Sequence, residues 1–600
     1  MTSLTERDLA ERGMTERDGD TLREATVLDD VDERSEPGAG FLRWAFAAPF
    51  LLWIIVALGA LLGRPPTAPA ELETLSAAWH MWQDHGWAPL RNGLGYGDQP
   101  PLTLWAILFG WQVFGIGDVW PRILSLLASF GTLWLVGSAA LSLWPHRAMT
   151  ELYARILLSG VMAFVLIVTM VQAEPLGLFF TALGFHALTR LWHAATRGLM
   201  SLFWWTVFAA TVSACLFTIG NAAWTMLPVL AAIAPRQIGV GPDRENAAGS
   251  ARITLGFHPA WHLPLIISLL PAAVLWVSWI LSLRIAGLPA DFLSFGNGWF
   301  HAATEATRRE LWSLALVPVL LYPWIVWKTL WRAMERQLRG RAGRSFRLCL
   351  GFFGVTLLGG LVSGWQMQGM TYIVLPLSLL GARLLATQEI RAKDFHAIVP
   401  SLLALLLGLF FFLMNIIPTA HLDALWRQFF DVPLPIWIGG IGMTSGLVLL
   451  VAGYGIAQLS PMHLLSRTIQ VATLPVLLMT CVNIEFPFNL RQFFDLEPVA
   501  ERLRELEDAG QPLAVFGPYR GEFDYYGRLT SAPVSLPDLN AALAWAKANP
   551  AGVIVSYFDG SPLRLPGLPY YRGVARDRWV AIWPTSAVLE TEGKALDGSF

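Results

Sequence analysis

The central part of this 600-residue chain carries few charges, and this restricts the fold more than any other feature. Of the 42 Lys and Arg and 44 Asp and Glu residues, 18 lie in residues 1–43 and 25 in residues 486–600. The 442 residues between them hold only 43, about 10%, whereas an ordinary soluble domain carries about a quarter. This composition predicts a polytopic α-helical membrane protein.

Apolar runs long enough to cross a bilayer recur through this central part. We expect thirteen spans, at approximately 41–62, 119–143, 152–171, 174–192, 201–218, 222–234, 262–283, 311–331, 348–363, 372–388, 396–417, 435–456 and 468–484. The transmembrane domain is therefore predicted over 41–485. Residues 1–40 hold twelve acids and five arginines, which predicts a disordered cytoplasmic tail.

The loops carry their basic residues unevenly, and this bias predicts the topology. If the run 101–114 does not cross the membrane, one set of alternate loops holds sixteen Lys and Arg residues, seven of them between Lys328 and Arg347. The opposite loops hold six. The positive-inside rule then predicts a cytoplasmic N-terminus, with the loop 64–118 and the segment 486–600 outside.

Two helices are expected within the loop 64–118. The run 101–114 is apolar but only about fourteen residues long, which favours an interfacial or re-entrant helix over a span. In 70–85, an apolar stripe at helical spacing is formed by Leu75, Ala78, Trp79 and Trp82. We expect both helices to lie along the outer membrane surface and to cover a cavity. Packing of the 70–85 helix on the bundle is the alternative.

Residues 486–600 have the composition of a water-soluble domain. A charged helix is expected at 497–510, strands at 512–517 and 552–558, a helix at 538–550 between them, and a hairpin at 573–583. Strand–helix–strand order predicts a small α/β domain outside the membrane.

Several classes of partner are disfavoured by composition. The net charge of −2 gives no basic excess, so no nucleic-acid partner is expected. Cys215, Cys349 and Cys481 all lie in apolar runs, which argues against a disulfide framework and a cysteine metal site. No sequence motif indicates a metal or another cofactor.

Polar residues at the predicted outer ends of the spans are the candidates for function, because ionisable groups in lipid are costly and usually functional. A carboxylate beside the membrane, covered by interfacial helices, suits a lipid-linked substrate whose tail stays in the bilayer. The candidates on this side are Glu71, Asp98, Gln99, Gln172, Glu174, Asn221, Arg308, Arg309, Gln366, Gln368 and Tyr372.

The loop 64–123 resembles the first external loop of bacterial GT-C glycosyltransferases. These are the relatives of dolichyl-phosphate-mannose protein mannosyltransferase and of lipid A aminoarabinose transferase. The matching residues in the loop are Gly86-Trp87, Pro100-Pro101-Leu102, Phe114-Gly115 and Arg122. Farther along, the resemblance extends to Glu174-Pro175-Leu176, Thr371-Tyr372, Pro376, Tyr519, Gly521, Phe523 and Gly527-Arg528-Leu529.

The chain departs from the family pattern at several charged positions. The family's Asp falls on Ala70, which leaves Glu71 alone, and its Lys falls on Gln99, although Asp98 keeps the neighbouring acid. The acid of the third span falls on Gln172 or Ala173 unless Glu174 substitutes for it. A Lys-Gly pair becomes Ile219-Gly220, and the His of a His-Tyr pair becomes Thr371.

The resemblance implies a glycosyltransferase at the outer face of the bacterial cytoplasmic membrane. It would move a sugar from a polyprenyl phosphate to a lipid, glycan or protein acceptor. Glu71 or Asp98 would be the general base. The leaving phosphate and the sugar would be bound by Gln99, Arg122, Glu174, Arg308, Arg309, Gln368 and Tyr372.

Other interpretations of these residues stay open. Glu71 has a structural alternative as an N-terminal helix residue stabilised by the helix dipole. The missing family charges favour a catalytically degenerate relative that binds a lipid-linked sugar or assists an active enzyme. A lipid or glycan transporter is a third possibility, although a transporter more often shows paired repeats and midplane charges, and the sequence contains no repeat.

Overall fold

The computed structural model describes the chain in several stretches. These are residues 39–88, 90–91, 94–95, 100–192, 198–220, 222–234, 259–287, 320–324, 327–339, 343–362, 371–387, Ile390, 398–430, 434–440, 442–458, 463–558, 569–575 and 578–597. Residues 1–38 of the expected tail and most of the expected span at 311–331 therefore fall outside the described residues.

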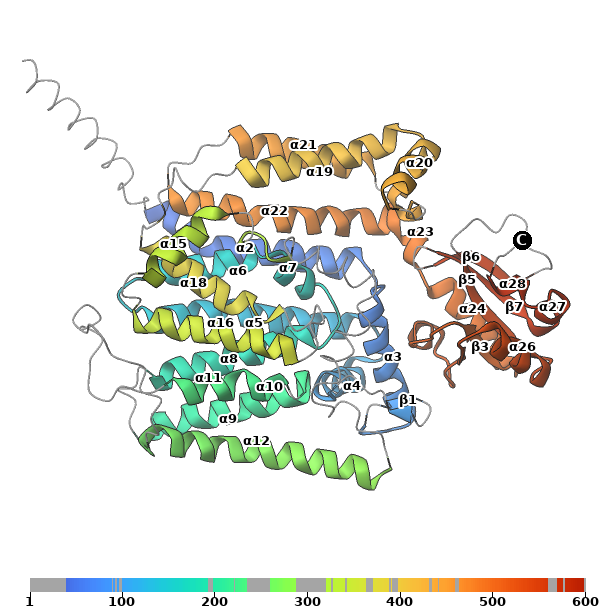
Figure 1. The fold of residues 1–600 in the computed structure, drawn as a ribbon, viewed down its shortest axis with the longest axis horizontal. Coiled ribbons are helices and arrows are strands. Elements are labelled where there is room, and N and C mark those ends of the chain that lie inside the picture. Colours follow the sequence, from blue (N-terminus) through green and yellow to red (C-terminus); the bar gives the residue numbers. More distant parts are fainter. Residues whose placement is uncertain are drawn as a thin grey trace, which may run out of the picture.

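Helices lying side by side form the larger part of the molecule (Figure 1). They are α2 (Ala39–Gly63), α5 (Val119–Leu143), α6 (Met149–Ser159), α7 (Met162–Val168), α8 (Glu174–Trp192), α9 (Leu199–Ile219), α10 (Ala222–Thr225), α11 (Leu227–Ile233), α12 (Pro259–Ile285), α16 (Arg344–Val362), α18 (Val374–Ala386), α19 (Ile398–Ile416), α21 (Met443–Gln458) and α22 (Leu464–Glu485). We call this set the bundle.

Among the described residues, six helices are long and apolar enough to cross a membrane. They cover Gly40–Gly63, Val119–Leu143, Leu199–Ile219, Pro259–Ile285, Ile398–Ile416 and Leu464–Phe494. Shorter apolar helices occupy Leu102–Phe114, Ala222–Ile233, Val374–Ala386 and Met443–Gln458. A polytopic helical protein is confirmed, while the expected number of thirteen spans stays a prediction.

The expected single span at 152–171 is instead two helices. Helices α6 and α7 are long and apolar enough to cross a membrane only when they are taken together. They are bent by 69° relative to each other. The break includes Gly160, which favours helix less than other residues except proline. A β carbon added at Gly160 would lie 2.6 Å from Cα of Ala472, so α22 also passes too close for a larger residue.

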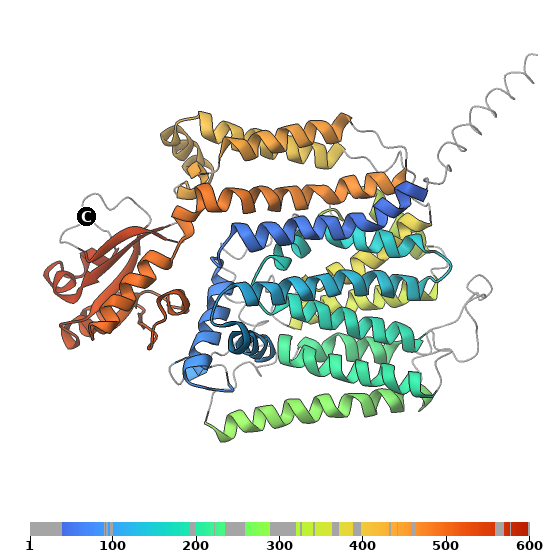
Figure 2. The same ribbon diagram turned by 180° about the vertical axis from the view of Figure 1, so that it is seen from behind.

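Two helices of the first loop lie across one end of the bundle. Helix α3 (Pro69–Gln83) runs across the bundle axis in Figures 1 and 2, and α4 (Leu102–Phe114) is seen almost end-on there. The short strands β1 (Leu90–Arg91) and β2 (Leu94–Gly95) form a hairpin between them. Both helices are present where the sequence predicts them, and their place at the membrane surface stays a prediction.

The apolar stripe of α3 is packed against protein. Leu75, Ala78 and Trp79 are buried in one cluster with residues of α4 and with Tyr525 of the C-terminal segment. Helix α4 exposes the larger apolar area, since Phe109, Val113 and Phe114 are 63, 59 and 67% exposed. The face that suits a membrane interface therefore belongs to α4.

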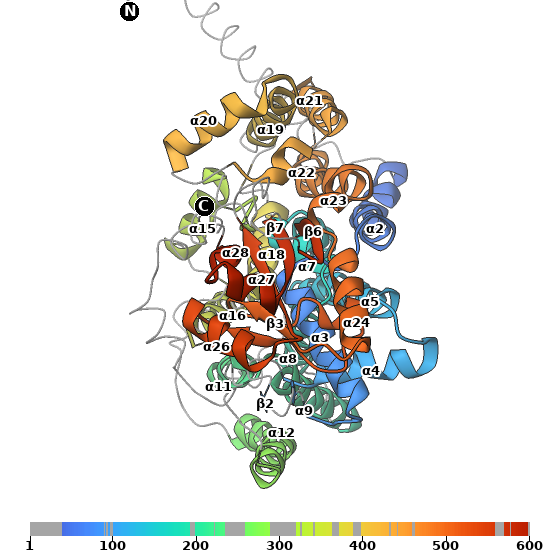
Figure 3. The ribbon, with the colours of Figure 1, turned by 90° about the vertical axis from the view of Figure 1, so that its right-hand side faces the viewer.

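The C-terminal domain contains a five-stranded sheet in the order β4-β3-β5-β7-β6 (Figure 3). Its strands are β3 (Leu513–Phe516), β4 (Val534–Leu536), β5 (Val553–Phe558), β6 (Tyr571–Ala575) and β7 (Arg578–Pro584), and its helices are α24 (Glu497–Asp508), α25 (Asp524–Gly527), α26 (Leu539–Ala548), α27 (Thr585–Glu590) and α28 (Lys594–Asp597). Strand β3 is parallel to β4 and β5, whereas β5, β7 and β6 are antiparallel. The expected α/β domain is confirmed.

Several elements were not predicted from the sequence. Helix α22 continues through the π-helix η5 (Phe486–Leu490) and α23 (Arg491–Phe494) before α24 begins. Helix α20 (Thr419–Phe430) and strand β4 also had no counterpart among the expected elements. The expected span 435–456 begins with the 3₁₀ helix η4 (Ile436–Gly440), and the α-helix α21 follows it.

The first loop and the C-terminal domain share one end of the bundle, which we call the domain end. Figures 1 and 2 show α3, α4 and the sheet there, whereas the basic helix α15 (Lys328–Arg339) lies at the opposite end. The positive-inside rule predicts that the domain end faces outward.

This orientation predicts the behaviour of a reporter fused after Phe600. A reporter that works only outside the cytoplasm should be active, and one that works only in the cytoplasm should be silent. The matched control is the same pair of reporters fused in the segment 340–342, which follows α15 and should give the opposite pattern. A cytoplasmic signal from the C-terminal fusion would contradict the orientation.

Candidate functional site

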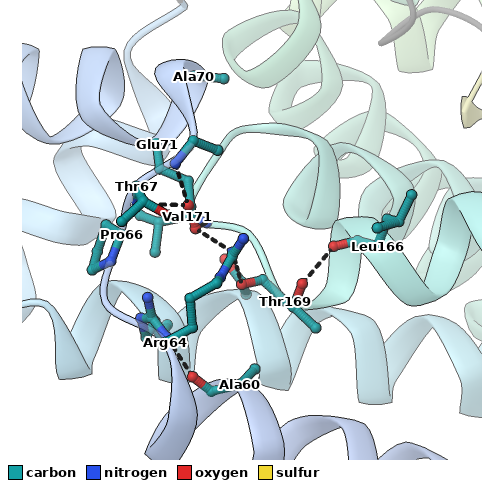
Figure 4. A network of polar contacts seen from close by, with 12 residues as sticks. Ala60, Arg64, Pro66, Thr67, Ala70, Glu71, Leu166, Thr169 and Val171 are labelled. Carbon is teal, nitrogen blue, oxygen red and sulfur yellow. Dashed lines mark hydrogen bonds and ion pairs between the residues drawn. The ribbon is translucent and has the colours of Figure 1, made fainter. Parts of the chain in front are cut away.

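Glu71 is fully buried at the first turn of α3, and both of its carboxylate oxygens are engaged (Figure 4). Its Oε1 accepts hydrogen bonds from Nη2 of Arg64 and the backbone N–H of Val171, each at 3.1 Å. Its Oε2 accepts from the backbone N–H groups of Thr67 at 3.2 Å and Ala68 at 3.1 Å. Four donors around one carboxylate are typical of a structural role at a helix N-terminus.

These hydrogen bonds attach α3 to the bundle. Nη2 of Arg64 also donates to the carbonyl of Thr169 at 3.2 Å, so Arg64 and Glu71 together bind the connection between α7 and α8. Ala70, at the position of the family's Asp, projects away from the network in Figure 4. The side chain at position 70 thus points elsewhere than the neighbouring Glu71.

Arg122 is buried near the start of α5. Its Nη1 donates to the carbonyl of Ala60, at the end of α2. Its Nε and Nη2 are buried and have no hydrogen-bond partner among the described residues. The guanidinium therefore keeps donors for an anion, although a ligand would need a path to it.

Glu174 and Tyr372 are two buried polar residues whose side chains have spare hydrogen-bonding capacity. Glu174 begins α8 and is 7% exposed, and Tyr372 directly precedes α18 and is 4% exposed. Oε2 of Glu174 and the hydroxyl of Tyr372 have no hydrogen-bond partner among the residues that the structure describes. Burial of such groups without a partner is costly, so these two atoms are candidates for contact with a ligand.

Glycines bring the surrounding elements close to this pair. A β carbon added at Gly177 would lie 2.1 Å from the Tyr372 hydroxyl, so the phenol reaches α8 one turn beyond Glu174. Gly220, which ends α9 with φ 68°, faces Pro100 of the first loop. The starts of α4, α8 and α18 and the end of α9 therefore converge at the domain end.

Five of the predicted site residues fall outside the described residues: Asp98, Gln99, Arg308, Arg309 and Gln368. Their roles stay predictions from the sequence. Among the described residues, no group of three or more His, Cys, Asp or Glu residues could hold a metal ion.

An apolar pocket of about 520 Å³ opens between α4, α9 and α12. Trp279 is one of its lining residues, and its ring centroid lies 4.8 Å from that of Trp87 and 5.3 Å from that of Trp105. The pocket is lined by Trp87, Leu102, Trp105, Ser213, Ala214, Phe217, Leu275, Ser278, Trp279 and Ser282. Leu102 lies two residues from Pro100, and Phe217 lies two residues from Ile219. The pocket therefore adjoins the place where the starts of α4, α8 and α18 and the end of α9 converge.

A buried polar cluster joins α3 to the C-terminal domain, and the sequence interpretation missed its central residue. Asp524 is fully buried and accepts hydrogen bonds from Ser76 of α3 at 2.7 Å and from Tyr519. Nε2 of His80 lies 3.0 Å from the same carboxylate. Two signals pointed to it: Ser76 and His80 are four residues apart on one helix face, and Asp524 lies inside the motif 519–529.

Solved structures share this fold. ArnT from Cupriavidus metallidurans bound to undecaprenyl phosphate has a TM-score of 0.62 and 16% identity, over 91% of this chain and 98% of that one. Its apo state has a TM-score of 0.63 and 15% identity, over 92% and 98%. No family model matches the sequence, and a search of curated proteins finds no match. The chain therefore shares the fold of ArnT, as expected from the resemblance of its first loop.

Proposed function

We propose that the chain is a membrane glycosyltransferase that moves a sugar from a polyprenyl-phosphate donor to an acceptor at the outer face of the bacterial cytoplasmic membrane. The observation that carries the proposal is the buried pair Glu174 and Tyr372, near an apolar pocket at the domain end. Oε2 of Glu174 and the hydroxyl of Tyr372 have no hydrogen-bond partner among the described residues. The fold is shared with ArnT, which has been crystallised with undecaprenyl phosphate.

Glu174 is our proposed general base. Among the predicted carboxylates, Glu71 has both oxygens occupied by four donors, whereas Oε2 of Glu174 has no partner among the described residues. A base must have a free oxygen within hydrogen-bond reach of the acceptor proton. Asp98 stays the alternative predicted from the sequence. We therefore assign to Glu71 the role of holding α3.

The proposed reaction is a displacement at the anomeric carbon. The carboxylate takes the proton of the acceptor hydroxyl while that oxygen forms the new glycosidic bond. The bond between the sugar and the phosphate breaks, and the phosphate leaves with the electron pair. Tyr372, Arg122, Gln99 and Gln368 are the proposed donors to the substrate, together with the pair Arg308-Arg309.

The apolar pocket is the proposed site for the first isoprene units of the donor. Three tryptophans and Phe217 give it a wall of large apolar rings, and only three serines contribute hydroxyl groups. Burial of apolar surface contributes about 25 cal/mol for each Å², so contact with a few isoprene units adds several kcal/mol to binding.

Replacing Trp279 by alanine tests this assignment. The substitution removes the ring that contacts Trp87 and Trp105, so undecaprenyl phosphate should bind at least about tenfold more weakly. Native mass spectrometry of the detergent-released full chain measures the bound fraction. Trp44→Ala is the control, because Trp44 lies on α2 and is 51% exposed. If both variants bound undecaprenyl phosphate as tightly as the parent, the assignment of the lipid to this pocket would be wrong.

A catalytically degenerate relative is the second candidate function. It is favoured by Ala70 in place of the family's Asp and by the occupied carboxylate of Glu71. This candidate predicts that the chain binds undecaprenyl phosphate without turning over any polyprenyl-phosphate sugar. The two candidates therefore differ in turnover and agree on binding.

A further inference from the structure

Helix α3 is fastened at two places to two different parts of the chain. Its first turn is bound to the bundle through Glu71, which accepts from Arg64 and from the backbone of Val171. Its middle is bound to the C-terminal domain through Ser76 and His80, both of which contact the carboxylate of Asp524. The helix thus connects the domain to the bundle.

The second fastening is a buried hydrogen-bonded cluster. Asp524, Ser76 and His80 are at most 3% exposed. A carboxylate only accepts hydrogen bonds, so Nε2 of His80 is the donor in this contact. Burial and the neighbouring Asp524 raise the pKa of the Tyr519 hydroxyl well above its ordinary value, so Tyr519 keeps its proton and donates to Asp524.

Further contacts surround this cluster and fix the orientation of the helix. Nε1 of Trp79 donates to the carbonyl of Leu529 at 2.8 Å, and the Arg528 guanidinium lies 4.9 Å from the Trp79 ring centroid. Leu72 of α3 is part of the apolar core of the C-terminal domain. Gly521, with φ 93°, allows close approach, because a β carbon there would lie 2.2 Å from Oγ of Ser76.

We propose that Asp524 is a positioning residue through which the C-terminal domain sets the geometry of the candidate site. By holding Ser76 and His80 it fixes α3. Glu71 in the first turn of α3 accepts from the N–H of Val171, and Arg64, which pairs with Glu71, donates to the carbonyl of Thr169, just before Glu174. The effect on turnover rests on the proposed function, whereas the effect on the position of α3 does not.

The physical reason is that a short helix transmits displacement along its whole length. Helix α3 has 15 residues, so its two fastenings lie on one rigid element only a few turns long. If the Asp524 cluster is broken, the first turn can shift together with Val171. Displacement of about 1 Å at a reacting group can lower a rate by about 10².

The test compares the parent with Asp524→Asn in the full chain, reconstituted in lipid nanodiscs. Hydrogen–deuterium exchange should become at least about tenfold faster in residues 66–83 and 169–173. For sugar transfer, kcat should fall by about 10². Binding of undecaprenyl phosphate should stay within about threefold, because the apolar pocket is untouched.

Glu73→Gln is the matched control. Glu73 also joins α3 to the C-terminal domain, through Arg520 at 3.4 Å, but Arg520 is 76% exposed there and exposed pairs contribute little. This variant should leave exchange and turnover unchanged. Ser76→Ala removes one donor only, so it should produce a smaller change in the same direction if Asp524→Asn does not fold.

Each outcome separates the inference from the proposed function. If exchange rises only within 497–597 and stays unchanged in 169–173, the positioning role is wrong whatever the turnover. If exchange rises in both segments but the parent transfers no sugar, the positioning role holds and the proposed catalytic function fails. If Glu73→Gln has the same effect as Asp524→Asn, the buried cluster has no special role.

Discussion

Replacing Glu174 by glutamine is expected to abolish detectable sugar transfer while leaving the protein folded and able to bind undecaprenyl phosphate. The substitution keeps the size of the side chain and removes the group that takes the acceptor proton. Loss of a general base typically lowers a rate by about 10² to 10⁴. Turnover of a labelled polyprenyl-phosphate sugar in membranes, measured beside lipid-phosphate binding, checks both parts.

The control for this prediction is Glu73→Gln, a carboxylate at the same end of the molecule whose side chain pairs with Arg520 instead. It should transfer sugar at the parent rate. Tyr372→Phe removes the hydroxyl near Gly177 and should lower turnover without abolishing it. If Glu174→Gln turned over at the parent rate, Asp98 and not Glu174 would be the proposed base.

Replacing Glu71 by glutamine should destabilise the whole protein. The side chains of Arg64 and Glu71 are 9% and 0% exposed, so the change leaves the Arg64 cation buried without its partner. Breaking a buried ion pair in this way costs about 3–5 kcal/mol. The amide also has one acceptor oxygen only, so its NH₂ group must face two of the four N–H donors whichever way it is turned.

Thermal unfolding in detergent checks this prediction. The unfolding midpoint of Glu71→Gln should fall by several degrees, and the midpoint of Glu174→Gln should not fall, because Oε2 of Glu174 has no hydrogen-bond partner to lose among the described residues. If Glu71→Gln kept the parent midpoint and lost turnover alone, Glu71 would be the base and our assignment of the two carboxylates would be reversed.

Much of the fold follows from composition and periodicity along the chain. The α/β order of the C-terminal domain follows from strand and helix signals in 497–583. The run 101–114 is too short to span, and α4 indeed lies across the bundle (Figure 1). These features depend on residues that are neighbours in the sequence, so local patterns are enough to predict them.

The packing partner of α3 could not be predicted in the same way. Trp79 is on an amphipathic stripe, and such a stripe is equally suited to lipid or to protein. The residue that accepts its hydrogen bond, Leu529, is 450 positions away. No local pattern pairs Trp79 with Leu529, so this contact becomes evident only in the folded chain.

The same distinction between local patterns and contacts of distant segments applies to the candidate site. Glu71 and Glu174 were both identified as carboxylates at the outer ends of helices, but their environments were not distinguishable from spacing alone. The difference lies in donors brought by other segments, since Val171 reaches Glu71 from 100 residues away. The role of Asp524 was missed because its partners Ser76 and His80 come from the first loop.

The most direct test of the central claim follows a radiolabelled sugar from a polyprenyl-phosphate donor in membranes that contain the full chain. Each available sugar is tried in turn, with membranes containing Glu174→Gln as the control. We predict that, for one donor, the label leaves the lipid phosphate and appears on an acceptor only with the parent chain. If the label stays on the lipid phosphate with every donor although undecaprenyl phosphate binds, the chain is a non-catalytic relative.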